Sequence, residues 1–172
     1  LYLNHLKKFP EGGSEGFNED SFKKIIPLLK LQSYIKDVKI MDDKIIDFNL
    51  DEWRSSNKEN QNYESVNICD AHLNTFNLSF NEKNTKWLTI EPINKSKVII
   101  NRTLRYQNKN FPWKDILDKY KNISFIGFEE EYNKFVSEFG NVNFIKTNDI
   151  ITMAKIISGA DIFIGNQSLA YS

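Results

Sequence analysis

In the second half of the chain, short apolar runs alternate with segments whose apolar residues recur at helical spacing. The runs lie at residues 98–100, 123–127, 142–145 and 162–164, and each is short enough to be a strand buried on both faces of a parallel sheet. This alternation of strand and helix predicts an α/β fold with right-handed crossovers. We therefore expect four parallel, adjacent strands near residues 98–101, 123–127, 142–146 and 161–165.

The ends of the three intervening helices carry their own signals. Pro112 suits the first helical position, Glu129–Glu131 suit a first turn because the helix dipole favours carboxylates there, and Asp149 begins the last helix. Gly140 and Gly159 stand where helices end, and Gly159 is expected at positive φ. The middle helix is predicted to bury one stripe of side chains, namely Phe128, Tyr132, Phe135, Val136 and Phe139.

The first half of the chain is less regular. Its predicted elements are strands at 1–3, 38–41 and 44–48, a loop at 11–16, a helix from Asn18 that is kinked or divided at Pro27, and a helix at 67–76. Residues 91–96 are the best linker candidate. We therefore predict two incomplete α/β domains, one over residues 1–90 and a Rossmann-like one over residues 97–172.

Composition narrows the classes of function. The 172 residues are 40% hydrophobic with zero net charge, which does not indicate a surface for nucleic acid or anionic membrane. One cysteine, Cys69, excludes an intramolecular disulfide and suits a reducing compartment, so a cytoplasmic location is expected. No apolar run approaches the roughly 18 residues of a membrane span.

The two ends of the sequence suggest a fragment. Leu1 opens inside an apolar strand-like run, and Ser172 stops in what reads as the first turn of a helix. A sheet that lacks its flanking pieces exposes apolar side chains, so we expect this chain to self-associate, as a twofold homodimer.

Candidate chemistry lies where the predicted strands end, because parallel strands bring their carboxyl ends to one edge of the sheet. Arginine is scarce, yet two of the three arginines, Arg102 and Arg105, follow the first strand of this half. Their rigid forks suit a diphosphate, and the alternative is a pair of surface salt bridges. The remaining binding-site candidates at this edge are Thr103, Glu129, Gly165, Asn166, Gln167 and Ser168.

Several of these candidates also have a structural interpretation. Asn166–Ser168 can offer donors to phosphate or sugar hydroxyls, or can cap the next helix. Glu129 can reach a ribose hydroxyl, or Glu129–Glu131 can simply start a helix.

The sequence gives little support for a metal site or for a phosphate loop. Cys69 and His72 have Cys-x-x-His spacing, but a zinc site needs three or four ligands, so no metal is expected. The sequence has no phosphate-loop motif and no Asp-x-Asp pair for a metal-dependent sugar transferase.

The motifs VIINRTLRYQNKNFPWKDIL, ISFIGFEEEYNKF and DIFIGNQSLAYS resemble the nucleotide-binding domain of ADP-heptose:lipopolysaccharide heptosyltransferases. LYLNH, IIPLLKLQSYIKDVKI and IIDFNLDEWR are similar to the acceptor domain of these two-domain (GT-B type) glycosyltransferases. The turn Gly165–Ser168 departs from the Asp-Thr-Gly type that is typical of the family.

The resemblance implies two facing Rossmann-like domains and transfer of a sugar from a nucleotide-sugar to a glycan or lipopolysaccharide-type acceptor, without metal or cofactor. The family's catalytic carboxylate would precede Leu1, so no catalytic residue is assigned, and His5 is the acceptor-side candidate. The alternative function is a non-catalytic nucleotide- or sugar-binding module. A flavodoxin-like or response-regulator-like domain would need an acidic cluster or a flavin loop at the strand ends, and the sequence has neither.

Overall fold

The chain is described by a computed structural model for residues 1–3, 7–8, 14–15, 18–41, 47–50, 52, 68–79, 81, 85–105 and 107–166. Its contacts divide it into one unit of residues Leu1–Lys39 with Thr89–Ser172, and a second unit of Ile40–Leu88. The predicted linker at 91–96 runs inside the first unit. The division into domains of residues 1–90 and 97–172 stays a prediction.

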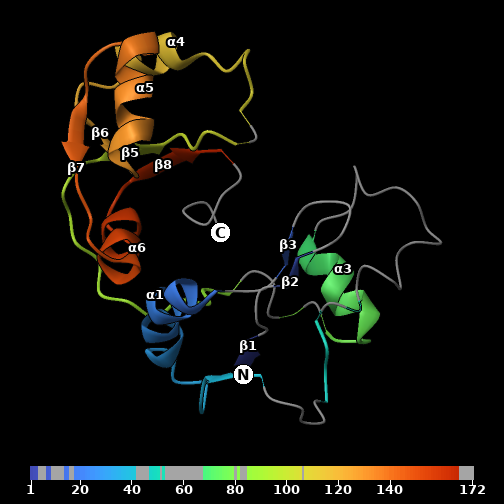
Figure 1. Ribbon diagram of the computed structural model, residues 1–172. Helices are drawn as coiled ribbons and strands as arrows, with labels where there is room; N and C mark the ends of the chain where they lie inside the picture. The colour runs from blue at the N-terminus through green and yellow to red at the C-terminus, as the bar shows by residue number, and fades with distance from the viewer. Residues whose placement is uncertain are drawn as a thin grey trace. The chain divides into compact units, whose positions relative to one another are not determined.

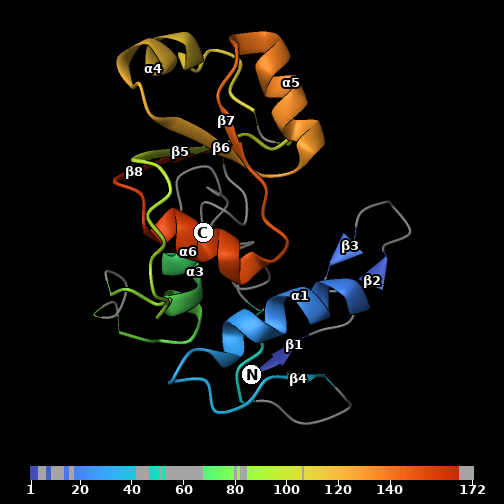
Figure 2. The same cartoon turned by 90° about the vertical axis from the view of Figure 1, so that its left-hand side faces the viewer.

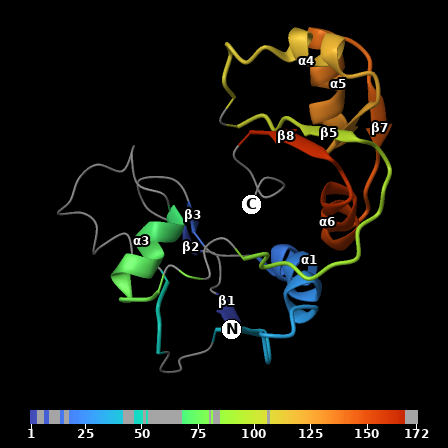
Figure 3. The ribbon, with the colours of Figure 1, turned by 180° about the vertical axis from the view of Figure 1, so that it is seen from behind.

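A four-stranded parallel sheet forms the centre of the first unit. Its strands are β5 (Val98–Asn101), β6 (Ile123–Ile126), β7 (Asn143–Ile145) and β8 (Ile162–Gly165), in the spatial order β7-β6-β5-β8. All three pairings are parallel, and β5 and β8 lie side by side, as Figure 3 shows from behind. The prediction of four adjacent parallel strands is confirmed, and with it the α/β class.

Helices cover both faces of this sheet. On one face lie α4 (Trp113–Lys119) and α5 (Glu129–Phe139), and on the other lies α6 (Ile150–Ser158) (Figures 1 and 2). Side chains alternate along a strand, so β5 sends Val98 and Ile100 into one core and Ile99 into the other. This two-sided burial explains why the strands read as continuous apolar runs.

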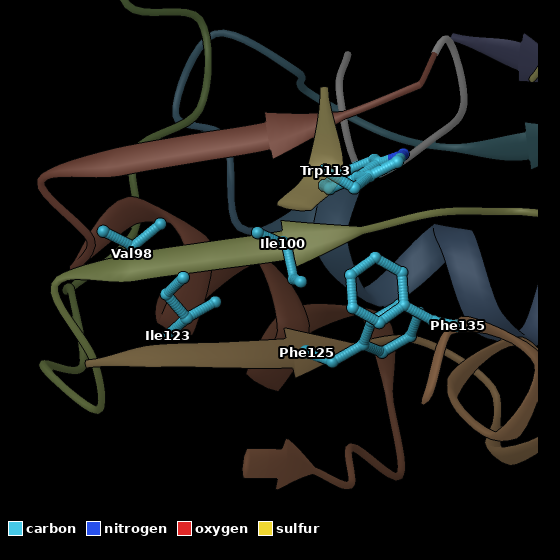
Figure 4. Packing of buried hydrophobic residues seen from close by; sticks show 6 residues of the cluster. All are labelled: Val98, Ile100, Trp113, Ile123, Phe125 and Phe135. Carbon is cyan, nitrogen blue, oxygen red and sulfur yellow. The ribbon is translucent and has the colours of Figure 1, made fainter. Parts of the chain in front are cut away.

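Aromatic rings fill the core under α4 and α5. The ring of Phe135 meets Trp113 edge-on at 5.2 Å between centroids and lies 5.4 Å from Phe125, and Figure 4 shows the three rings beside Ile100. Each fully buried side chain of this size stabilises the fold by roughly 1.5–3 kcal/mol.

Phe128 was predicted to join this core, and that prediction is wrong. Its side chain is 76% exposed, whereas Phe135 is fully buried. Phe128 precedes α5 with an extended backbone (φ −78°, ψ 151°), so it falls outside the helical stripe to which its spacing assigned it.

The helix starts follow the sequence closely. The Asp149 carboxylate accepts hydrogen bonds from the Thr152 backbone N–H (2.7 Å) and hydroxyl (2.8 Å) at the start of α6. At the start of α5, Glu131 Oε2 accepts the Phe128 N–H at 3.0 Å. Pro112 is the cap residue of α4 rather than its first helical residue. Gly140 ends α5 at φ 111°, as a helix-terminating glycine should.

Gly159 ends α6 for a different reason from the one predicted. Its φ is −90°, not positive. A Cβ at this position would lie 2.5 Å from the carbonyl oxygen of Ile93, whose own N–H donates to the Lys155 carbonyl at 2.9 Å. The close approach of this backbone to α6 requires glycine.

The remaining elements are small. The helix α1 (Glu19–Lys30) is capped by Asn18, which accepts from the Ser21 N–H at 2.8 Å, and continues through Pro27 without dividing. The other elements are α3 (Ile68–Thr75) and the pairs β1 (Tyr2–Leu3) with β4 (Lys39–Ile40) and β2 (Lys7–Lys8) with β3 (Ser14–Glu15). The predicted loop at 11–16 thus contains β3, and most of the predicted strand at 44–48 lies outside the described residues. Across the described ranges, no helix is long and apolar enough to cross a membrane.

The contact at Gly159 gives a stability prediction. The substitution Gly159→Ala should lower the free energy of unfolding by about 1–3 kcal/mol, because the clashing atom is backbone and cannot rotate away. Urea denaturation measures this change. The exposed neighbour Ser158→Ala is the matched control and should change stability by no more than about 0.5 kcal/mol. Equal stability of the Gly159 variant and wild type would show that the Ile93 segment moves freely.

The cap of α6 should make stability depend on pH. Hydrogen bonds from the Thr152 backbone and hydroxyl lower the pKa of Asp149 below its ordinary value of 3.8. A lowered folded-state pKa stabilises the fold above the unfolded-state value, and this contribution is lost as pH falls through the folded-state value. Asp149→Ala should therefore lower the free energy of unfolding by about 0.5–2 kcal/mol at pH 7. The difference in unfolding free energy between the variant and wild type should shrink below about pH 4. A difference in unfolding free energy that stays constant from pH 7 to pH 2 would show that the charge of Asp149 does not stabilise the helix start.

Candidate functional site

The best candidate site is the edge of the sheet where β5 and β8 end. The two strands finish level with each other, since Asn101 pairs with Gly165. The chain leaves β5 toward β6 and β7 and then returns across β5 to form β8, so the strand order reverses between β5 and β8. Open α/β sheets bind ligands at such a switch point, outside the carboxyl ends of the strands.

Asn166 ties together the two loops that leave this edge. Its Oδ1 accepts the Thr103 N–H at 2.8 Å, and its Nδ2 donates to Thr103 Oγ1 at 2.7 Å and to the carbonyl of Arg105. The Thr103 hydroxyl itself donates to the Arg105 carbonyl at 3.2 Å. The structure thus brings together three predicted site residues, and the Asn166 amide holds the loop that follows β5.

Gln107 strengthens the same loop. Its Nε2 donates to the Thr103 carbonyl at 2.7 Å, four residues back along the chain. Sequence reasoning did not select Gln107, because a glutamine in a polar loop carries no pattern that distinguishes it.

The Arg102 side chain makes its contacts within the protein. Its guanidinium bonds the Glu138 carboxylate at 2.9 Å and lies 5.0 Å from the centre of the Phe139 ring, with only 9% of the side chain exposed. Of the two interpretations of the arginine pair, the salt bridge therefore describes Arg102, although the partner comes from α5 and the contact is buried on the arginine side. A diphosphate contact from Arg102 stays a prediction.

The residues at the end of β6 are closely packed. Asn101 Nδ2 donates to the Ile126 carbonyl at 2.7 Å and so joins the ends of β5 and β6. Gly127, at φ 150°, has no room for a Cβ, which would lie 2.7 Å from Glu131 Oε2. Glu129 begins α5 and is exposed, as a residue that meets a ribose would have to be.

Other predicted site residues lie outside the described part of the chain. These are Gln167 and Ser168, which follow Asn166, and the acceptor-side candidate His5. Gly165 is described and closes β8, where a Cβ would lie 2.9 Å from the Phe163 ring. Among the described residues, no three His, Cys, Asp or Glu side chains gather into a group that could hold a metal ion.

The site combines an exposed arginine with a loop that hydrogen bonds hold in place. Asn166, Thr103 and Gln107 fix the loop, and the exposed Arg105 lies on it. An arginine on a fixed loop at a strand end suits a phosphate or a carboxylate.

The Asn166 contacts predict energetic coupling to Thr103. Asn166→Ala and Thr103→Val should each lower the unfolding free energy, and the double variant should lose about 0.5–1.5 kcal/mol less than the sum, since one hydrogen bond is shared. Denaturant titration of the four proteins completes the cycle. Thr103→Ser, which keeps the hydroxyl, is the control and should retain the coupling. Additive losses, within about 0.3 kcal/mol, would show that the two side chains do not interact in solution.

Comparison of the chain with protein-family models, with curated proteins and with solved structures found no match. The chemistry of the β5–β8 edge is therefore the basis on which a function can be proposed.

Proposed function

We propose that this chain binds the diphosphate of a nucleotide-sugar between the ends of β5 and β8, as the donor-binding part of a glycosyltransferase. One observation carries the proposal: the strand order reverses between β5 and β8, and Asn166 joins the polar loops that leave these two strands. Ligand sites in sheets of this kind are built from such loops.

Arg105 is the residue that we assign to the diphosphate. Its side chain is exposed at the edge, and its backbone carbonyl is held by Asn166 and Thr103. A guanidinium on a held loop loses less freedom on binding than one on a loose segment. Arg102 contributes less, because Glu138 already neutralises its charge.

Sugar transfer would follow from this placement. The diphosphate leaves the sugar with a developing negative charge, which a positioned arginine stabilises, while a base activates the acceptor hydroxyl. No described residue is assigned as that base. A glycan or lipopolysaccharide-type acceptor, with His5 near it, and independence from metal are parts of the proposal that rest on the sequence resemblance.

A non-catalytic nucleotide- or sugar-binding module is the second candidate, and one observation favours it. The pairing of Arg102 with Glu138 leaves Arg105 as the exposed arginine of the β5 loop. Binding needs less charge at the edge than stabilisation of a leaving diphosphate does. A transfer assay with a nucleotide-sugar and a glycan acceptor separates the two candidates, since a binding module releases no nucleoside diphosphate.

The proposal predicts binding that depends on Arg105. In calorimetric titrations with ADP, UDP and inorganic pyrophosphate, Arg105→Ala should weaken affinity about 10- to 100-fold, because a charge-assisted contact contributes about 1.5–3 kcal/mol. Arg105→Lys should recover only part of the loss, since it keeps the charge without the fork.

Lys109→Ala is the matched control, because it removes one exposed positive charge from the same loop. It should change affinity by less than about threefold at physiological salt, where exposed charges are screened. Equal losses in the Lys109 and Arg105 variants would show a general charge effect instead of a site. Absence of binding of all three probes at millimolar concentration would reject the proposed function.

A further inference from the structure

Phe128 is the most exposed large hydrophobic side chain in the described part of the chain, at 76%. It directly follows Gly127 at the end of β6, on the same edge of the sheet as the proposed diphosphate site. An aromatic ring left in water at a ligand-binding edge is an apolar surface that a ligand can cover.

The backbone beneath this ring is fixed. The Phe128 N–H donates to the buried carboxylate of Glu131 at 3.0 Å, and its carbonyl accepts the Tyr132 N–H at 3.0 Å. On the other side, Gly127 packs so closely against Glu131 and Asn101 that a Cβ has no room. The backbone that carries the ring is therefore held in place by hydrogen bonds and close packing, and it would lose little freedom when a ligand covers the ring.

The spacing of the strands gives the separation of the strand ends along this edge. β5 lies between β6 and β8, and the residues at the three strand ends are nearly level in the register. Neighbouring strands are about 4.8 Å apart, so the ends of β6 and β8 are separated by about 10 Å. A nucleoside with its first phosphates spans a distance of this order.

The charges along the edge are arranged asymmetrically. Glu129 and Glu130 are exposed at the start of α5, next to Phe128, whereas Arg105 lies on the loop that Asn166 holds. A diphosphate is repelled by the two carboxylates and attracted by the arginine. Charge complementarity therefore directs the phosphates toward β8 and leaves the uncharged base at the β6 side.

We propose that Phe128 is the platform on which the nucleobase of the bound nucleotide stacks. This inference rests on the proposed function and deepens it, because it assigns the orientation of the ligand along the edge. Stacking on an aromatic ring tolerates any base, so Phe128 provides affinity for a nucleotide over bare pyrophosphate without selecting the base.

The test compares nucleotides with pyrophosphate in the full chain. Phe128→Ala should weaken the binding of ADP and of UDP about 5- to 100-fold and leave the binding of inorganic pyrophosphate unchanged. Phe128→Trp should retain nucleotide affinity, and its additional fluorescence relative to wild type should be quenched by ADP but not by pyrophosphate. Arg105→Ala, in contrast, should weaken all three ligands.

Tyr34→Ala is the matched control, because Tyr34 is also highly exposed, at 61%, but follows α1 outside the four-stranded sheet. It should leave all three affinities unchanged. If the protein binds pyrophosphate and Phe128→Ala binds ADP as tightly as wild type does, the stacking platform is overturned while the diphosphate site stands. If neither nucleotide nor pyrophosphate binds, both the proposed function and this inference fail.

Discussion

The pairing of β8 with β5 is the interaction on which the rest of the structure depends. β5 is buried along its whole length, with Ile99 and Ile100 fully inaccessible, because it has a strand on each side and helices on both faces. β8 reaches it only after about sixty intervening residues, and closing such a loop costs conformational entropy that burial must offset. The same pairing brings Asn166 to Thr103. The fold and the candidate site therefore depend on the same strand pairing, and a variant that loosens β8 should affect both.

The side chains at this edge are of two kinds, buried and exposed. A buried polar group without a partner is costly, so the buried ones have been matched: Arg102 with Glu138, Asn101 with the Ile126 carbonyl, and Glu131 with the Phe128 N–H. These contacts hold the ends of β5 and β6 and the start of α5. The side chains of Arg105, Glu129 and Phe128 are exposed and are therefore accessible to a ligand.

The sequence predicted the elements better than their contacts. Apolar runs located the ends of the four strands to within one residue, and Asp149 and Asn18 marked their helix starts, because both signals are local. Three features were not predictable in the same way. The exposure of Phe128 depends on a backbone turn that apolar spacing does not encode. The partner of Arg102 lies 36 residues further along the chain. Gly159 is required by Ile93, a contact between segments 66 residues apart.

The pairing of Arg102 also bears on whether the edge catalyses or only binds. An ion pair at 2.9 Å exerts a weak field at distances beyond its own length, because the carboxylate cancels most of the guanidinium charge. In the proposed site, Arg105 then attracts a diphosphate more strongly than Arg102 does. A charge-assisted contact of this kind contributes about 1.5–3 kcal/mol to binding, whereas enzymes lower reaction barriers by about 8 kcal/mol or more. Catalysis would thus need further groups that act on the sugar or on the acceptor, and the difference between transferase and binding module lies in those groups rather than in the β5–β8 edge.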